Sequence, residues 1–420
     1  MKIAAVRVTP IAIQDPPLLN ASGVHEPYAL RSIIEIEADN GLVGLSETYG
    51  ERTTLEGLTR VKDSLVGLSP FDLNGLARAV ARHAAAKAPN ASSGTNAPAY
   101  ADKPDAKVFS GFEVAMLDLQ ARHLGIPLHE LLGGAVRRQI PFSAYLFFKF
   151  AHDVDPSYAP DPWGEVLNEA QIVQEARSMI EQYGFGSIKL KAGALPPEQE
   201  VACLKALKRA FPTHPLRIDP NANWSLETGT RMASLLAGDL EYYEDPTPTL
   251  EGMARLHADT GLPLATNMVV TDFEEFRRNI GCNGVQIILS DHHYWGGLRA
   301  TQTLAQMCDT FGIGLSMHSN SHLGISLMAM SHVAAVVPNL TYACDTHYPW
   351  QSDEVIRGGK IEIKDGCVTL TDAPGLGVEL DHDALAALHE QYLRCGIRDR
   401  DDAAQMRKFR PDWQRIKPRY

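Results

Sequence analysis

Apolar runs that alternate with amphipathic stretches organise the chain after residue 139. The runs read SIKLK, LRIDP, LEYYE, LPLAT, GVQIILS and IGLSM, and residues with helical spacing lie between them. Because neighbouring parallel strands need a crossover helix between them, this alternation predicts a (β/α) barrel. An open, doubly wound sheet is the alternative, although no glycine-rich phosphate turn opens the series.

The two ends of the chain have a different pattern of apolar and polar residues. Residues 3–49 are strand-like, and the turn at Asn40-Gly41 is a strong hairpin signal. Three helices are predicted next, over 53–66, 72–87 and 109–124, with an irregular loop rich in Ala, Ser, Pro and Asn over 88–105. Near the C-terminal end, KIEIKDGCVTLTD predicts a hairpin that turns at Asp365-Gly366, and a helix is expected over 382–394.

Composition narrows the class of protein. The 420 residues are 45% hydrophobic, enough for a large domain and a smaller one. A formal net charge of -12 argues against nucleic acid or an anionic membrane as the main partner, whereas a small anionic ligand is compatible with it. The chain shows no signal-peptide pattern, no apolar stretch of about 18 residues and only scattered cysteines. We therefore expect a soluble, cytoplasmic protein with free thiols.

Polar residues close the apolar runs at regular intervals. They are Lys191, Asp219, Glu244, Asn267, Asp291 and His318, at successive spacings of 28, 25, 23, 24 and 27. In a parallel barrel the C-terminal ends of the strands converge on one mouth, where such folds carry their chemistry. These side chains are therefore predicted to share one site.

Three of these residues form a candidate metal site. Asp219, Glu244 and Asn267 would bring two carboxylates and a carboxamide from consecutive strands, a set of hard oxygen ligands that suits Mg²⁺. Each residue alone is more often a turn or helix-start residue, but three at this spacing favour the metal.

Histidines offer a rival metal site. The run Asp291-His292-His293 and the pair His318 and His322 could suggest zinc or iron, which bind imidazole well. Adjacent side chains on a strand end point apart, however, and the sequence contains neither HExxH nor HxH. The oxygen ligands are therefore the preferred interpretation.

Two groups could act as bases. Asp291 bonded to His318 would fix the imidazole tautomer and support its other nitrogen as a base. Lys189 and Lys191 lie two apart on one strand, so their ammonium groups share a face. On an ordinary strand this pattern indicates a solvated face, but beside a metal the crowded positive charge would favour a neutral, basic lysine. Lys191, nearer the mouth, is the predicted base.

Further motifs extend this constellation: LLNASGVHEP (18–27), AYLFF (144–148), KLK (189–191), DPNANW (219–224), EDP (244–246), ATNM (265–268), HSNSH (318–322), CDTHYPWQ (344–351) and RDRDDAAQM (398–406). Together with Asp291 they resemble the enolase superfamily and, within it, the glucarate dehydratase group. The resemblance implies an α/β fold, a modified (β/α)₇β barrel of the TIM type with an α+β capping domain. On this expectation residues 1–137 form the cap, 138–375 the barrel with the metal and catalytic residues, and 376–420 return to the cap.

The resemblance also implies individual roles. The Mg²⁺ ligands would be Asp219, Glu244 and Asn267. The catalytic residues would be Lys191 as one base, His318 with Asp291 as the opposing base and acid, Lys189, Asn221 and Asn320. The substrate-binding residues would be Asn20, His25, Tyr145, Phe147, Lys189 (on the substrate carboxylate), His347 and Arg400.

The implied reaction removes the C5 proton of D-glucarate, stabilises the enediolate with Mg²⁺ and eliminates the C4 hydroxyl, giving 5-dehydro-4-deoxy-D-glucarate. The alternatives are dehydration or epimerisation of another acid sugar (L-idarate, galactarate or an aldonate), a barrel that only binds a ligand or partner, and a zinc-dependent hydrolase. The expected partners are a small dicarboxylate sugar acid and further copies of the chain in a homo-oligomer, with neither nucleic acid nor membrane.

Two features depart from the group's pattern. The stretch 85–107 is longer and different, and a threonine contact usually supplied near it has no counterpart. Lys149 adds a cation where a smaller neutral residue is expected. Both bear on which diacid is bound, because that loop is expected to cover the site.

Overall fold

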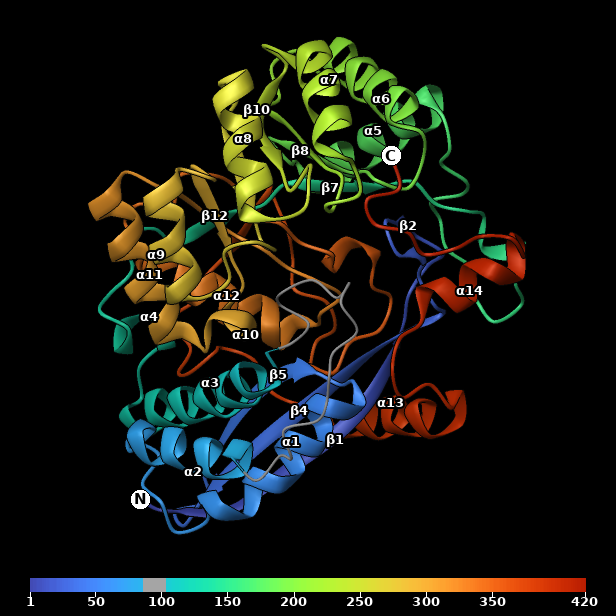
Figure 1. The fold of residues 1–420 in the computed structure, drawn as a ribbon. Coiled ribbons are helices and arrows are strands. Elements are labelled where there is room, and N and C mark those ends of the chain that lie inside the picture. Colours follow the sequence, from blue (N-terminus) through green and yellow to red (C-terminus); the bar gives the residue numbers. More distant parts are fainter. Residues whose placement is uncertain (86–102) are drawn as a thin grey trace.

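An antiparallel sheet and a parallel barrel make up most of the chain, of which this computed structural model describes residues 1–85 and 103–420 (Figure 1). The antiparallel sheet has the order β1-β4-β5, from β1 (Ile3–Gln14), β4 (Tyr28–Ala38) and β5 (Val43–Tyr49). The predicted turn at Asn40-Gly41 joins β4 to β5, and Gly41 has the positive φ of 82° that such a turn requires. A short hairpin, β2 (Leu19–Asn20) with β3 (Gly23–Val24), lies between β1 and β4 in sequence.

Both ends of the chain supply helices, several of which pack on this sheet. They are α1 (Arg52–Lys62), η1 (Asp63–Leu65), α2 (Leu73–Ala85), α3 (Pro104–Leu124), α4 (Leu128–Leu131), α13 (His382–Cys395) and α14 (Asp402–Phe409). Helix α3 contacts both β5 and the barrel helix α10 (His292–Trp295), and α13 packs on β1 (Figure 1). Of the loop predicted over 88–105, residues 88–102 lie outside the described residues and 104–105 belong to α3.

The barrel is a parallel sheet in which each strand pairs with the next along the chain. Its strands are β7 (Ala144–Phe147), β8 (Ile188–Lys191), β9 (Leu216–Asp219), β10 (Leu240–Glu244), β11 (Leu264–Thr266), β12 (Ile287–Ser290) and β13 (Gly314–Met317). Residues 340–344 bridge its two edges, because Leu340 pairs with Leu315 and Cys344 pairs with Phe142. This topology confirms the predicted (β/α) barrel and excludes the doubly wound sheet.

Helices that follow the strands cover the barrel. They are α5 (Glu169–Tyr183), α6 (Pro197–Ala210), α7 (Leu226–Leu236), α8 (Leu250–Thr260), α9 (Phe273–Cys282), α11 (Leu298–Phe311) and α12 (Gly324–Val336), with short 3₁₀ turns η3 (His152–Val154) and η4 (Tyr348–Trp350) in loops. Ser225, Thr249 and Asp272 cap the N-termini of α7, α8 and α9 through side-chain oxygens. These local signals define the helix starts.

The predicted hairpin near the C-terminal end is wrong in its pairing. Lys364 and Cys367 do form the expected turn, with backbone bonds of 3.0 and 2.9 Å. The strand after it, β14 (Cys367–Thr369), pairs instead with β6 (Gln139–Pro141), and residues 361–363 form no strand. Pairing with β6 buries Val368 in the main core, which the local hairpin pattern could not predict.

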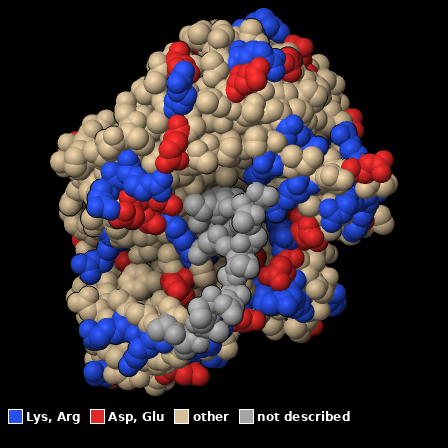
Figure 2. Space-filling view, viewed as in Figure 1, with Lys and Arg blue, Asp and Glu red and all other residues tan. Residues whose placement is uncertain are grey.

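The visible surface is mixed in charge. In the view of Figure 2, Lys and Arg side chains interleave with Asp and Glu. Within the described residues, none of the helices has both the length and the apolar character to span a membrane.

The Asn168 cap of α5 gives a stability prediction. Its side-chain oxygen accepts N–H bonds from Ala170 and Gln171, both at 3.1 Å. Asn168→Ala removes this acceptor, so we expect the free energy of unfolding in a urea titration to fall by about 1 kcal/mol. Gln174→Ala, exposed on the same helix, is the control and should change it by less than about 0.5 kcal/mol. Equal effects of both substitutions would contradict a capping role.

Candidate active site

A cavity lies at the C-terminal ends of the barrel strands, and the cap supplies part of its wall. Barrel residues, the β2–β3 hairpin and the segment before α14 all contribute to its lining. Eleven of the residues predicted from the sequence line it: Asn20, His25, Tyr145, Phe147, Lys191, Asn221, Asn267, His318, Asn320, His347 and Arg400. The structure thus brings residues from positions 20 to 400 to one place.

The proposed metal ligands occupy consecutive strand ends. Asp219 ends β9, Glu244 ends β10 and Asn267 directly follows β11, and all three side chains are buried. Glu244 Oε2 and Asn267 Oδ1 have no hydrogen-bond partner among the described residues. Buried oxygens are rarely left without a partner, so these two atoms are suited to bind a cation or a hydrogen-bond donor.

Negative charge is in excess around these ligands. Burial, reinforced by the Asp219 carboxylate, raises the pKa of Glu244 well above its ordinary value and that of Asp245 to about 7. Asp245 also accepts the backbone N–H of Asn267 at 2.9 Å, which orients that residue. The positive charge of a bound cation would favour the ionised carboxylates and so offset both causes of the raised pKa, and the residues present therefore fit a divalent cation with oxygen ligands.

Both lysines of β8 point to the same side, as their spacing predicts. Lys191 Nζ donates to Asp219 Oδ2 at 2.6 Å and lines the cavity. Lys189 lies one step deeper and donates to Glu244 Oε1 and Asp345 Oδ2, each at 2.6 Å. Lys189, predicted also to contact the substrate carboxylate, does not line the cavity, because these two carboxylates hold its ammonium group below it.

These carboxylates also set the protonation of the lysines. Burial lowers the pKa of Lys191, but the Asp219 carboxylate outweighs burial and holds this pKa above its ordinary value. Asp345 and Glu244 do the same for the pKa of Lys189. Crowding two ammonium groups is therefore not enough by itself to give a neutral lysine; the expectation from the sequence was for a lysine beside a metal. A cation on the shared carboxylates would weaken their hold on the lysine protons.

His318 and Asp291 follow adjacent strands, and the parallel register brings them together. Asp291 Oδ2 accepts a hydrogen bond from His318 Nδ1 at 3.1 Å, which leaves Nε2 as the nitrogen that can take up a proton. Burial raises the pKa of Asp291, but His293 and His318 outweigh it and hold this pKa well below the ordinary value. An ionised carboxylate thus orients the imidazole, as predicted for a general base.

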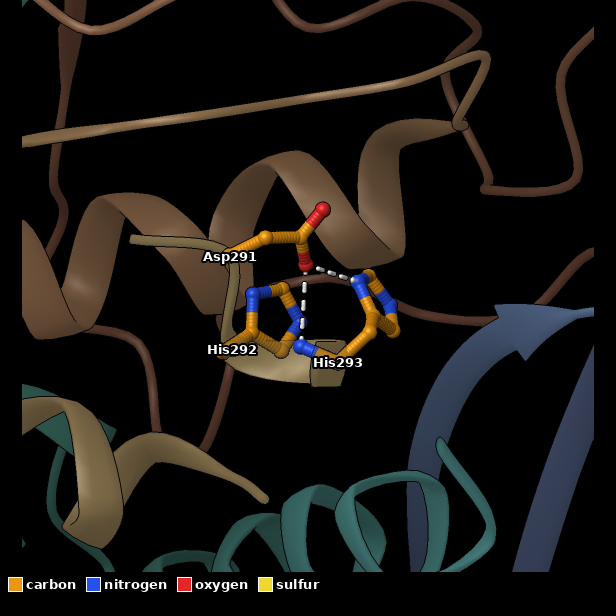
Figure 3. Close-up of side chains that lie close together, drawn as sticks. All are labelled: Asp291, His292 and His293. Carbon is orange, nitrogen blue, oxygen red and sulfur yellow. Dashed lines mark hydrogen bonds and ion pairs between the residues drawn. The ribbon is translucent and has the colours of Figure 1, made fainter. Parts of the chain in front are cut away.

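The rival histidine cluster is also present. Among residues 1–85 and 103–420, Asp291, His292 and His293 are the one group of three or more His, Cys, Asp or Glu side chains close enough together to hold a metal (Figure 3). Asp291 Oδ1, however, already accepts from His293 Nδ1 at 2.8 Å and from the backbone N–H of His293 at 2.9 Å. Two of its three ligand atoms are thus bonded to each other, so the cluster fits a hydrogen-bonded pair better than a metal.

Three predicted substrate contacts approach from outside the barrel. Asp402 accepts from Arg400 Nε at 2.6 Å and from Asn20 Nδ2 at 2.9 Å. Asp15 Oδ2 lies 3.0 Å from His25 Nδ1 and 3.3 Å from Arg400 Nη1. Arg400 is therefore already paired with two carboxylates, and what it can offer a diacid is directed N–H bonds rather than unbalanced charge.

Aromatic rings form one wall of the cavity. Tyr145 and Phe147 alternate along β7, and both ring centroids lie 4.9 Å from the ring of His347. Burial, with His25 nearby, lowers the pKa of His347 well below its ordinary value. His347 is thus a neutral imidazole in this wall at ordinary pH.

Family models match both parts of this chain. The one described as "Enolase C-terminal domain-like" covers residues 171–384, and the one for the "Mandelate racemase / muconate lactonizing enzyme, N-terminal domain" covers residues 3–133. The chain belongs to the enolase superfamily. Within it, this enzyme falls in the glucarate dehydratase group, since it is 50% identical to a probable glucarate dehydratase of Streptomyces coelicolor over 98% of this chain and 97% of that protein.

Solved structures confirm the fold of this superfamily member. An enolase of Pseudomonas fluorescens Pf0-1, solved with bound magnesium, potassium and tartrate, is 67% identical and has a TM-score of 0.96, covering 100% of this chain and 99% of that one. An enolase of Mycobacterium smegmatis complexed with tartrate is 52% identical with a TM-score of 0.93, covering 100% and 98%. The predicted family and the capped barrel are therefore confirmed.

Among the buried carboxylates that the sequence interpretation missed, Asp345 is the one that a sequence signal could have found. Asp345 follows the segment that closes the barrel and binds Lys189. It lies 27 residues after His318, the same interval as between Asp291 and His318. Extending the regular interval between strand-end residues once beyond His318 would have predicted Asp345. Asp15 and Asp402, which belong to no barrel strand, carry no such signal.

Lys149, the cation that departs from the group's pattern, does not line the cavity of this enzyme. Its buried Nζ donates to both oxygens of Asp161 at 3.1 Å and to the carbonyl of Gly164 at 2.5 Å. Backbone bonds between Lys149 and Val166 run in both directions, at 2.9 and 3.0 Å. Lys149 therefore fastens residues 150–166 to the end of β7 instead of adding charge to the site.

Lys149→Met keeps the aliphatic stem and removes the ammonium group. Because Asp161 and Gly164 lose a buried donor, we expect the free energy of unfolding to fall by about 2 kcal/mol in a urea titration. Tyr158 of the fastened segment donates to the carbonyl of His25 at 2.5 Å, so KM for the acid sugar is expected to rise as well. Lys205→Met, at a more exposed ion pair, is the control. An unchanged unfolding midpoint and KM would refute the fastening role.

Proposed function

We propose that this enzyme is a Mg²⁺-dependent acid-sugar dehydratase and that its substrate is D-glucarate. The observation that carries the proposal is the position of two candidate bases in one cavity, Lys191 on β8 and the His318–Asp291 pair after β13 and β12. Next to them lie two buried oxygens that have no hydrogen-bond partner in the described part of the chain, Glu244 Oε2 and Asn267 Oδ1. The similarity to a probable glucarate dehydratase, and the tartrate in two similar structures, support a hydroxylated diacid.

The proposed reaction breaks two bonds of the substrate. The base that faces C5 takes the proton, and the electron pair left on carbon becomes part of the enediolate of the C6 carboxylate. The C4–O bond then breaks, with His318 giving a proton so that the hydroxyl leaves as water. The resulting enol takes up a proton on C4 and loses the proton of its C5 hydroxyl, giving 5-dehydro-4-deoxy-D-glucarate. Mg²⁺, held by Asp219, Glu244 and Asn267, would supply positive charge beside the carboxylate on which negative charge develops.

The far end of the diacid would meet the cap. Asn20, His25 and Arg400 line the cavity there, held by Asp402 and Asp15. A carboxylate that accepts their N–H bonds would gain directed, charge-assisted contacts. Because these donors are held in place by buried carboxylates, a shorter or monoacid substrate would leave them without an acceptor and bind less tightly.

Incubation with D-glucarate, L-idarate and galactarate in D₂O with Mg²⁺ tests the proposal. Dehydration predicts a keto product from D-glucarate, detected by NMR. An epimerase, the second candidate, has the same two bases and predicts only deuterated diacids, without a keto product. If neither exchange nor elimination occurs with any acid sugar, the catalytic proposal is wrong and a binding role takes its place.

A further inference from the structure

The carboxylate of Asp291 serves two imidazoles at once. Its Oδ2 bonds to His318 Nδ1 at 3.1 Å, and its Oδ1 bonds to His293 Nδ1 at 2.8 Å and to the backbone N–H of His293 at 2.9 Å (Figure 3 shows the second pair). A carboxylate only accepts, so both Nδ1 atoms must donate. His293 is buried and does not line the substrate cavity.

The other end of His293 reaches the cap. Its Nε2 lies 3.2 Å from the carbonyl oxygen of Glu47 on β5 and 3.3 Å from the hydroxyl of Ser326 on α12. The side chain of Glu47 is itself fixed, since it pairs with Arg31 at 2.7 Å and accepts the backbone N–H of Ser326 at 2.9 Å. His293 is thus held at both nitrogens, between the Asp291 carboxylate and a rigid part of the cap–barrel boundary.

This arrangement can fix the orientation of the Asp291 carboxylate, which is otherwise free to rotate. The terminal torsion of an aspartate is broad, so its rotamer does not fix the carboxylate plane and hydrogen bonds must do so. Besides the two imidazoles and the backbone N–H, the hydroxyl of Tyr49 lies 3.5 Å from Oδ2, at the limit of a hydrogen bond. The strongest restraint on Oδ1 is therefore the pair of N–H groups of His293.

We propose that His293 is a positioning residue for the general base: its Nδ1–H fixes the Asp291 carboxylate so that Oδ2 faces His318. The proposal rests on the proposed function, because it concerns proton transfer by His318. It assigns a role to the cluster in Figure 3 without a metal. Lys191 is held by Asp219 on another strand, so its own proton transfer does not depend on His293.

Two substitutions at one position separate this role from packing. His293→Asn places an amide N–H near the Nδ1 position and keeps a donor for Asp291, whereas His293→Gln extends its amide toward the Nε2 position and loses that donor. In D₂O, His293→Gln should lower deuterium exchange on the substrate face served by His318 by about 10- to 100-fold. Losses of this size are typical when a residue that orients a functional side chain is removed. Exchange on the face served by Lys191 should stay within about twofold in both variants, and His293→Asn should restore most of the His318 activity.

His292→Asn is the matched control. Its imidazole is the buried neighbour of His293, and its Nε2 has no hydrogen-bond partner among the described residues. This variant is expected to leave both exchange rates within about twofold. Equal losses on both faces in His293→Gln, or no loss on either, would overturn the proposal. Absence of exchange in the unsubstituted protein would instead overturn the proposed function.

Imidazole ¹⁵N NMR of the unsubstituted, Mg²⁺-loaded protein gives a test that needs no variant to fold. The proposal predicts a proton on Nδ1 of both His293 and His318. A His293 protonated only at Nε2 could not donate to Asp291, and this result would also overturn the proposal.

Discussion

Lys191→Ala is expected to stop deuterium exchange at C5 of only one of the two epimers D-glucarate and L-idarate, and His318→Asn to stop it at the other. The reason is geometric. Lys191 ends β8, whereas His318 follows β13, so the two bases approach the cavity from different sides of the barrel mouth. Removing a general base costs about 10²- to 10⁴-fold. Proton NMR of each epimer in D₂O with Mg²⁺ measures the loss directly.

Which epimer loses deuterium exchange is more informative than how far the exchange rate falls. Lys205→Ala, on the outer surface of α6, is the control for loss of a lysine and should leave exchange of both epimers unchanged. Equal residual exchange from both epimers in either active-site variant would contradict the assignment of one base to each face.

Asn267→Ala is expected to weaken Mg²⁺ binding by at least about tenfold. Its Oδ1 has no hydrogen-bond partner among the described residues, so truncation removes a candidate ligand without breaking a bond within the chain. Calorimetric titration of the metal-free protein measures the affinity. Thermal unfolding gives a second measure, because Mg²⁺ at about 100 times its Kd should stabilise the native protein by about 2.7 kcal/mol and the variant by less at the same concentration.

Asn279→Ala is the control for a buried asparagine elsewhere. Asn279 bonds to the backbone of Val285, before β12 begins and away from the C-terminal strand ends, so its loss is expected to lower stability but to leave the affinity for Mg²⁺ unchanged. If Asn267→Ala bound Mg²⁺ as tightly as the unsubstituted protein, Asn267 would not be a ligand.

The barrel and the core of its site could be predicted because their signals are periodic. Each strand pairs with the next along the chain, so an interval of 23 to 28 residues in sequence becomes a neighbouring position at the mouth. This is why Asp291 and His318 lie in hydrogen-bond contact, as their strand order predicts. The same rule, applied once more, leads to Asp345.

Contacts that the cap makes could not be derived in this way. Asn20, His25 and Arg400 were assigned only through family resemblance, and their partners Asp15 and Asp402 were missed. The segments that carry them come together over more than 300 residues of sequence, and no period in the chain encodes that approach. The pairing of β14 with β6 instead of with its own hairpin partner has the same cause.

The balance of charges around Lys191 depends on distances, which the sequence does not give. Two like charges on one strand suggest a lowered pKa, but Asp219 Oδ2 lies 2.6 Å from Lys191 Nζ and reverses the sign. A pattern shows which charges are near one another along a strand; it does not show which opposite charge is nearest in space.

The most direct test is NMR of D-glucarate incubated in D₂O with the Mg²⁺-loaded protein. The account predicts that the C5 proton signal disappears and that a keto product with a deoxygenated C4, 5-dehydro-4-deoxy-D-glucarate, accumulates with release of one water. Recovery of unlabelled D-glucarate after prolonged incubation with the metal-loaded protein would contradict it.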